Sequence, residues 1–238
     1  PSDASDGDDA EAQAVAQAPQ VAAARSAADE RPGEDWPKFL GPLETGVSRE
    51  TGLLETWPEE GPPLVWSRKI GTGYAAPSVL GNRLVVHHRP RELVCFVGRD
   101  VVTGETLWKY EYPSDFEDPY GYNNGSRFAL LLTGTRCYTF GPQGKLLCLD
   151  LNTGKVVWDH DTASEWKIPT NFFGAGCTPI LEGNLLIVLV GGQPDSGVVA
   201  FNAESGKVVW ESVGKKSWDG VEMWNTGRKL KWSDSEKL

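Results

Sequence analysis

The feature that most constrains the fold of this chain is an eleven-residue pattern that occurs three times, at 98–108, 148–158 and 200–210. Each copy has Asp or Asn at its third position, Thr or Ser followed by Gly at the sixth and seventh, and Trp at the eleventh. The matching residues are Asp100, Asp150 and Asn202; Gly104, Gly154 and Gly206; and Trp108, Trp158 and Trp210. A period of about fifty residues indicates a repeat architecture.

Each copy of the pattern predicts a strand, a tight turn and a second strand. The Asp or Asn side chain can bond to the backbone of the turn, and Gly supplies the positive φ that the turn needs. Another predicted hairpin precedes each copy, at 76–86, 128–140 and 177–188, with turns at Gly81-Asn82, Gly134-Thr135 and Gly183-Asn184. Every unit therefore has four predicted strands, and we expect its Trp to pack the unit against a neighbour.

Four-stranded antiparallel units of this length are typical of β-propeller blades. The repeated pattern resembles the tryptophan-docking motif of pyrroloquinoline-quinone-like (PQQ-like) repeats, found in quinoprotein alcohol dehydrogenases and BamB-like envelope proteins. The segment 36–42, Trp-Pro-Lys-Phe-Leu-Gly-Pro, resembles the lead-in of the same group. We expect an all-β fold: a partial propeller of about three blades plus one orphan outer strand, with a disordered N-terminal tail.

The predicted organisation has four parts. Residues 1–35 are rich in Ala and acidic residues and predict a disordered linker, 36–61 an irregular lead-in, 62–214 the blades, and 215–238 a polar tail or the start of a truncated blade. In 62–70 we expect the orphan outer strand, because Trp66 matches Trp108. Since propellers close with about four to eight blades, the remaining blades are expected from a missing part of the chain, or alternatively from another chain.

Charge and composition exclude some classes of protein. The formal net charge is −10, and no basic block could follow a phosphate backbone, so nucleic acid is not expected as a partner. The sequence contains no run of 18 apolar residues, so no transmembrane segment is predicted.

Cys137, Cys148 and Cys177 lie in or beside predicted strands, so we expect their thiols to be buried. We expect His87-His88 at an exposed turn, because the pair lies between a predicted strand and Arg89-Pro90-Arg91.

Two connections, 113–126 and 162–176, are longer than is usual between neighbouring strands, and such loops tend to be functional. They form a candidate binding rim of acidic, amide and aromatic side chains: Asp115, Asp118, Tyr120, Tyr122, Asn123, Trp166, Asn171, Phe172 and Phe173. The alternative is an insertion that only packs over the seam between two blades.

The resemblance implies two kinds of function. A quinoprotein dehydrogenase would need PQQ, a Ca²⁺ held by oxygen ligands, an Asp base, a Trp under the quinone and, in many members, two adjacent cysteines. No Cys-Cys pair occurs, and the acidic loop residues match no recognisable calcium loop. We therefore assign no catalytic residue, metal ligand or cofactor, and PQQ with calcium belongs only to the alternative.

The function predicted first is a non-catalytic, BamB-like protein-interaction or assembly scaffold of the cell envelope. It would be periplasmic, envelope-attached or secreted, and would bind envelope proteins or extended peptides through the loop rim or strand edges. One alternative is a PQQ- and calcium-dependent alcohol dehydrogenase whose active site lies mostly in missing blades. The other is an extracellular binder of carbohydrate or peptide.

Overall fold

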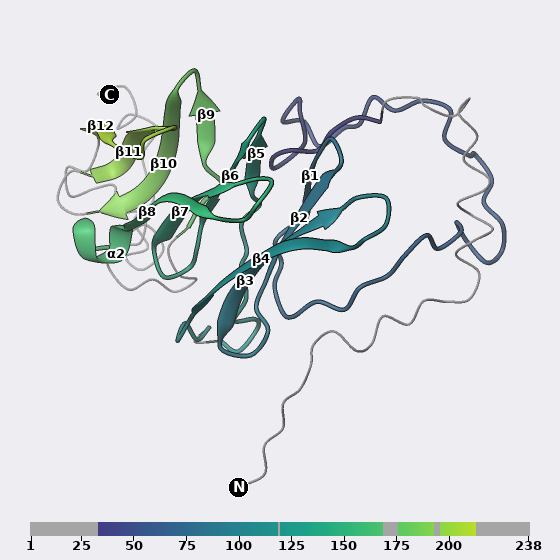
Figure 1. Ribbon diagram of the computed structural model, residues 1–238, viewed down its shortest axis with the longest axis horizontal. Helices are drawn as coiled ribbons and strands as arrows, with labels where there is room; N and C mark the ends of the chain where they lie inside the picture. The colour runs from purple at the N-terminus through teal and green to yellow at the C-terminus, as the bar shows by residue number, and fades with distance from the viewer. Residues whose placement is uncertain (1–32, 119, 169–175, 193–195, 213–238) are drawn as a thin grey trace, which may run out of the picture.

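The computed structural model describes residues 33–118, 120–168, 176–192 and 196–212. Within these ranges it contains three four-stranded antiparallel sheets, which follow one another side by side (Figure 1). The first sheet holds β1 (Ser78–Leu80), β2 (Arg83–His88), β3 (Leu93–Asp100) and β4 (Thr106–Pro113); the second holds β5 (Leu131–Thr133), β6 (Arg136–Phe140), β7 (Lys145–Asp150) and β8 (Val156–Asp161); the third holds β9 (Ile180–Glu182), β10 (Leu185–Gly192), β11 (Ser196–Asn202) and β12 (Val208–Ser212). One turn of helix, α2 (Thr162–Glu165), follows β8. The prediction of an all-β fold built from four-stranded blades is confirmed.

The three sheets share one irregularity of register between their third and fourth strands. The pairing of the third strand with the fourth shifts at Gly98/Arg99, at Cys148/Leu149 and at Ala200/Phe201. These shifts fall at the same place in the repeated pattern, just before its turn. The turn itself is closed by the side chain at the third position: Asp150 Oδ1 accepts from the amide of Thr153 at 2.9 Å. Gly154 follows with φ +68°, a conformation that favours glycine.

Hydrophobic side chains fill the two seams between neighbouring sheets. In the first seam, Phe96 and Trp108 pack with residues of the second sheet, such as Leu147. The second seam joins side chains of the second and third sheets, among them Tyr138, Leu146, Trp158, Leu186, Val188 and Phe201. The core therefore lies between blades, because each sheet buries its faces against its neighbours.

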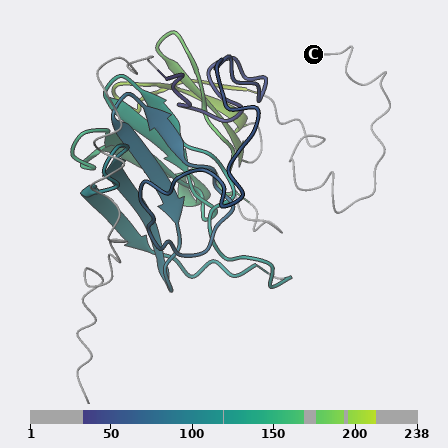
Figure 2. The same ribbon diagram turned by 90° about the vertical axis from the view of Figure 1, so that its right-hand side faces the viewer.

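The lead-in lies along the inner strands of the first two sheets. Trp36 forms an antiparallel bridge with Val79 of β1, and the Pro37 carbonyl accepts from the amide of Leu132 in β5 at 2.8 Å. Figure 1 places this purple segment beside β1 and β5, and Figure 2 shows the same segment after a quarter turn. The predicted linker, 1–35, and the predicted tail, 215–238, lie outside the described residues, apart from 33–35.

The expected outer strand in 62–70 is not present as a strand. An extended segment becomes a strand only when neighbouring backbone pairs with it, and no such neighbour occurs among the described residues. Trp66 nevertheless contacts the first blade, as described below. The described residues contain no helix with the length and hydrophobicity of a transmembrane segment.

The prediction of an exposed His87-His88 turn is wrong. Both side chains lie on β2, where the exposed fractions are 2% for His87 and 9% for His88. His87 stacks on Phe96, with ring centroids 4.2 Å apart. The Nδ1 atom of His88 accepts from the amide of Gly71 at 3.0 Å. The strand extends to the second histidine because both residues pair with β3, at Phe96 and Cys95.

Burial should make the thiols of this chain slow to react. It raises the pKa of Cys148 to about 12 and that of Cys177 to about 11, and the thiolate is the reactive form. We expect iodoacetamide at pH 8 to label Cys137, Cys148 and Cys177 at least about 100-fold more slowly in the native protein than in urea. Peptide mass spectrometry locates the label, and rapid native labelling of Cys137 or Cys148 would contradict the buried positions.

Candidate functional site

Trp108 and Trp158 each contact the turn of the following repeat. The indole N–H of Trp108 donates to the carbonyl of Leu151 at 2.8 Å, and the ring lies against Gly154. A Cβ atom at position 154 would be 2.4 Å from this ring. Glycine is therefore required twice here, for its positive φ and for the close approach of the indole.

The same contact recurs on both sides of Trp108. Trp66 donates to the carbonyl of Val101 at 3.1 Å and Trp158 to that of Ala203 at 2.9 Å. Their rings lie against Gly104 and Gly206 respectively. Trp210 holds the same place in the third repeat, and its side chain is 37% exposed. The contacts therefore connect each repeat to the next along the described chain.

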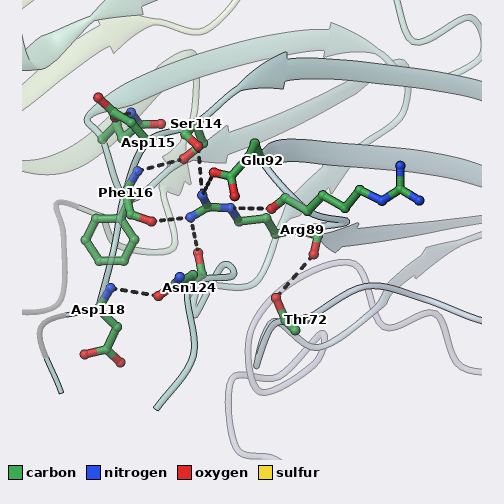
Figure 3. A network of polar contacts seen from close by, with 10 residues as sticks. Thr72, Arg89, Glu92, Ser114, Asp115, Phe116, Asp118 and Asn124 are labelled. Carbon is green, nitrogen blue, oxygen red and sulfur yellow. Dashed lines mark hydrogen bonds and ion pairs between the residues drawn. The ribbon is translucent and has the colours of Figure 1, made fainter. Parts of the chain in front are cut away.

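A buried arginine organises the connection 113–126. Arg89, which follows the histidines of β2, is 3% exposed, and its guanidinium reaches into this loop (Figure 3). It donates to the carbonyls of Arg91 at 3.0 Å, Ser114 at 2.8 Å, Asn124 at 3.0 Å and Phe116, and forms an ion pair with Glu92 at 3.0 Å. Both ends of the loop are therefore attached to one cation. Sequence reasoning missed this role, because the preceding His87-His88 pair was expected at an exposed turn.

Asp118, a predicted rim residue, is used inside the loop. Its carboxylate accepts from the amides of Tyr120 at 2.9 Å and Asn123 at 3.1 Å, and pairs with Arg127. These hydrogen bonds, of which the one from the Tyr120 amide has the largest effect, hold the pKa of Asp118 below its usual value, although burial alone would raise it. Asn123 also acts within the loop, since its side-chain oxygen accepts from the amide of Gly125 at 2.7 Å.

The loop presents two tyrosines to solvent. Tyr120 is 52% exposed and Tyr122 is 71% exposed, and their rings stack with centroids 6.2 Å apart. Tyr74, from the segment before β1, is also exposed, and the guanidinium of Arg127 lies 5.5 Å from its ring centroid. Asp115 is exposed at the start of the loop, where it bonds to the side chain of Gln143.

The other predicted rim residues do not join this group. Trp166 is 8% exposed and belongs to the second seam, where its ring meets Phe201 edge-on at 5.7 Å. Its place in the core differs from the predicted place on a rim. Asn171, Phe172 and Phe173 lie outside the described residues.

A carboxylate that bonds several loop amides should determine the order of the loop. We expect Asp118→Asn to increase the rate of chymotrypsin cleavage at Tyr120 and Tyr122, because an amide cannot accept at both oxygen positions or pair with Arg127. Cleavage followed by mass spectrometry gives the rate. Asp115→Asn is the matched control, since Asp115 is exposed and bonds only to a side chain in the described structure; equal rates for the two variants would contradict the role of Asp118.

The acidic residues of the loop do not fit a calcium site. Ca²⁺ takes six to eight oxygen ligands at about 2.3–2.6 Å. Both oxygens of Asp118 already accept hydrogen bonds, and the Arg127 cation lies against one of them. Within the described ranges no three His, Cys, Asp or Glu side chains are grouped as metal ligands would be. The loop is therefore an internally bonded surface.

A groove that the sequence did not predict lies at the inner edge of the sheets. It has a volume of about 520 Å³ and runs between the lead-in and the inner strands β5 and β9. Its walls are mainly apolar: Phe39, Leu40, Leu131, Pro179, Ile180 and Leu181. The sequence of a single strand cannot indicate this groove, because the groove forms only where separate repeats and the lead-in meet.

A family model described as outer membrane protein assembly factor BamB matches residues 100–229, just over half of the chain. The chain belongs to this PQQ-like repeat family. Most of the matched segment is the second and third repeats, with their repeated turns and tryptophans.

Relatives of both kinds occur in this family. The dehydrogenase subunit of a quinone alcohol dehydrogenase from Komagataeibacter europaeus is 31% identical over 118 residues, covering 47% of this chain and 16% of the relative. BamB from Bordetella pertussis is 25% identical over 148 residues, covering 61% and 32%. BamB from Moraxella catarrhalis has a TM-score of 0.43 at 22% identity, covering 63% of this chain and 40% of that structure. The chain thus spans less than half the length of these relatives.

Proposed function

We propose that this chain forms blades of a non-catalytic propeller that binds other proteins in the cell envelope. The observation that carries the proposal is the state of Asp118. Its carboxylate, the most buried acid of the long loop, is neutralised by Arg127 and bonded to two loop amides. A catalytic carboxylate or a metal ligand needs an accessible oxygen, whereas this one serves the shape of the loop.

The surfaces left for function are apolar and extended. They comprise the stacked Tyr120 and Tyr122 on the loop and the groove at the inner edge. Aromatic side chains and open strand edges are suited to protein contacts. A periplasmic or envelope-attached location accords with the relative named as an outer membrane protein assembly factor.

A PQQ- and calcium-dependent alcohol dehydrogenase is the second candidate. It is supported by the relatives named as quinone alcohol dehydrogenases, one of which is 31% identical over 118 residues. Its active site would have to be built from residues other than those of the loop 113–126. An extracellular binder of carbohydrate is a third candidate, since the exposed tyrosine pair could also stack on a sugar ring.

The candidates are distinguished by a cofactor titration of the full chain. PQQ and Ca²⁺ are added while tryptophan fluorescence and dye-linked oxidation of ethanol are followed, with a quinoprotein alcohol dehydrogenase reconstituted in parallel as positive control. We expect no saturable quenching at micromolar PQQ and no turnover. Saturable quenching together with turnover would overturn the non-catalytic proposal.

A further inference from the structure

The inner strands β1, β5 and β9 hold equivalent positions in the three sheets. Val79, Leu132 and Leu181 are each the middle residue of their strand, and each pairs with the second residue after the following turn. In an antiparallel ladder the N–H and C=O of one residue point to the same side. Because the register is equal, the backbone N–H and C=O groups of all three residues point in the same direction within their sheets.

The contacts of the lead-in show that these backbone groups point to the open edge of each sheet. The N–H and C=O of Val79 both bond to Trp36, each at 2.9 Å, on the side away from β2. The amide of Leu132 donates to the carbonyl of Pro37 at 2.8 Å. Two of the three inner edges thus bind one extended segment. Among the described residues, Leu181 bonds to no backbone group outside the pairing of β9 with β10.

The groove lies directly beside this third edge. Ile180, next to Leu181, is 58% exposed, and Phe39 on the opposite wall is 56% exposed. The charged residues at its border, Lys38 and Glu44, form an ion pair with each other. The groove therefore offers apolar contacts and a backbone edge to a ligand, without an excess of either charge.

We propose that the inner edge of β9 binds an extended segment of a partner protein that has no net charge, as an added strand, with apolar side chains packed against Phe39 and Ile180. The lead-in, which carries an aromatic residue beside a proline, occupies the equivalent edges of β1 and β5 and so indicates the kind of segment that fits this edge. Main-chain bonds would supply the pairing and the groove the selectivity. The inference rests on the proposed protein-binding function and names its surface.

The experiment uses the full chain and a fluorescein-labelled peptide that copies residues 35–42, which carries one acidic and one basic side chain. Fluorescence anisotropy should show saturable binding. Ile180→Lys should weaken the binding at least about tenfold, because it places a charge in an apolar groove. Leu189→Lys on β10 is the matched control, since Leu189 is also 58% exposed, and should leave the affinity unchanged.

A second peptide tests the strand pairing itself. N-methylation of its Trp amide removes the donor that corresponds to the Trp36 N–H and should also lower affinity at least about tenfold. Near-UV circular dichroism establishes that Ile180→Lys is folded. No saturable binding up to about 100 µM peptide, or binding that Ile180→Lys leaves unchanged, would overturn the proposal. The second result would place the peptide at another edge.

Two further measurements separate the possible failures. Sedimentation of the chain without peptide should show no self-association through this edge. Self-association that Ile180→Lys abolishes would make a second copy of the chain the occupant and would overturn the partner proposal. The cofactor titration is repeated on the same preparations. If the chain oxidises ethanol with PQQ and also binds the peptide at β9, the non-catalytic function is overturned and this inference stands. If it does neither, this inference is overturned and the non-catalytic function stands.

Discussion

Replacing Trp108 by Ala should lower the free energy of unfolding by about 3 to 5 kcal/mol. The indole is 6% exposed, packs in the first seam and donates to the carbonyl of Leu151 at 2.8 Å. Its removal leaves a cavity between two sheets and an unpaired carbonyl, and both effects destabilise the folded chain. Urea unfolding followed by far-UV circular dichroism measures the loss.

Trp210→Ala is the matched control for this change. Trp210 has the same place in its repeat but is 37% exposed. We expect this substitution to cost less than about 1 kcal/mol, as is usual where little packing is lost. Equal losses for the two variants would show that the tryptophans act within their own sheets and do not connect successive repeats.

Replacing His87 by Phe should make the protein markedly more resistant to acid. Burial, with a smaller contribution from the charge of His88, lowers the pKa of His87 from 6.5 to about 3. The unfolded chain therefore takes up a proton between these pH values while the folded chain does not. Stability from the neutral His87 is complete above pH 6.5 and is lost as the pH falls toward 3. At about 1.4 kcal/mol for each pH unit, the loss approaches about 5 kcal/mol.

The expected result is a smaller decrease in stability between pH 7 and pH 4 for His87→Phe than for the unmodified chain. Neither ring nitrogen of His87 has a hydrogen-bond partner among the described residues, so Phe should cost little at pH 7, where it keeps the stacking on Phe96. Urea unfolding at both pH values gives the difference. Parallel pH dependences for the two proteins would contradict a buried, neutral His87.

The repeated turns were the part of the fold that could be predicted best. Asp150 and Gly154 act through local chemistry, a side chain that bonds to nearby amides and a residue that accepts positive φ. Such chemistry depends on neighbours in the sequence. The strand predicted around Trp66 failed for the opposite reason, because a strand exists only with a partner that pairs with it.

The candidate site was less predictable, because its side chains depend on distant residues. Acidic residues such as Asp118 look alike in a sequence whether they face solvent or bond to Arg127 inside a loop. Arg89 likewise became structural only when β2 placed it beside both ends of the connection 113–126. The inner groove combines the lead-in with two repeats, so no single motif could indicate it.

The most direct test of the whole account is hydrogen exchange of the tryptophan indole N–H groups in this chain, followed by NMR with assigned side-chain resonances. If each tryptophan connects its repeat to the next, the indoles of Trp108 and Trp158 should exchange slowly, because each is bonded to a backbone carbonyl in a buried seam. Trp210 should exchange at a rate near that of an exposed indole. Fast exchange at Trp108 and Trp158, comparable with that of Trp210, would contradict the connected-blade structure.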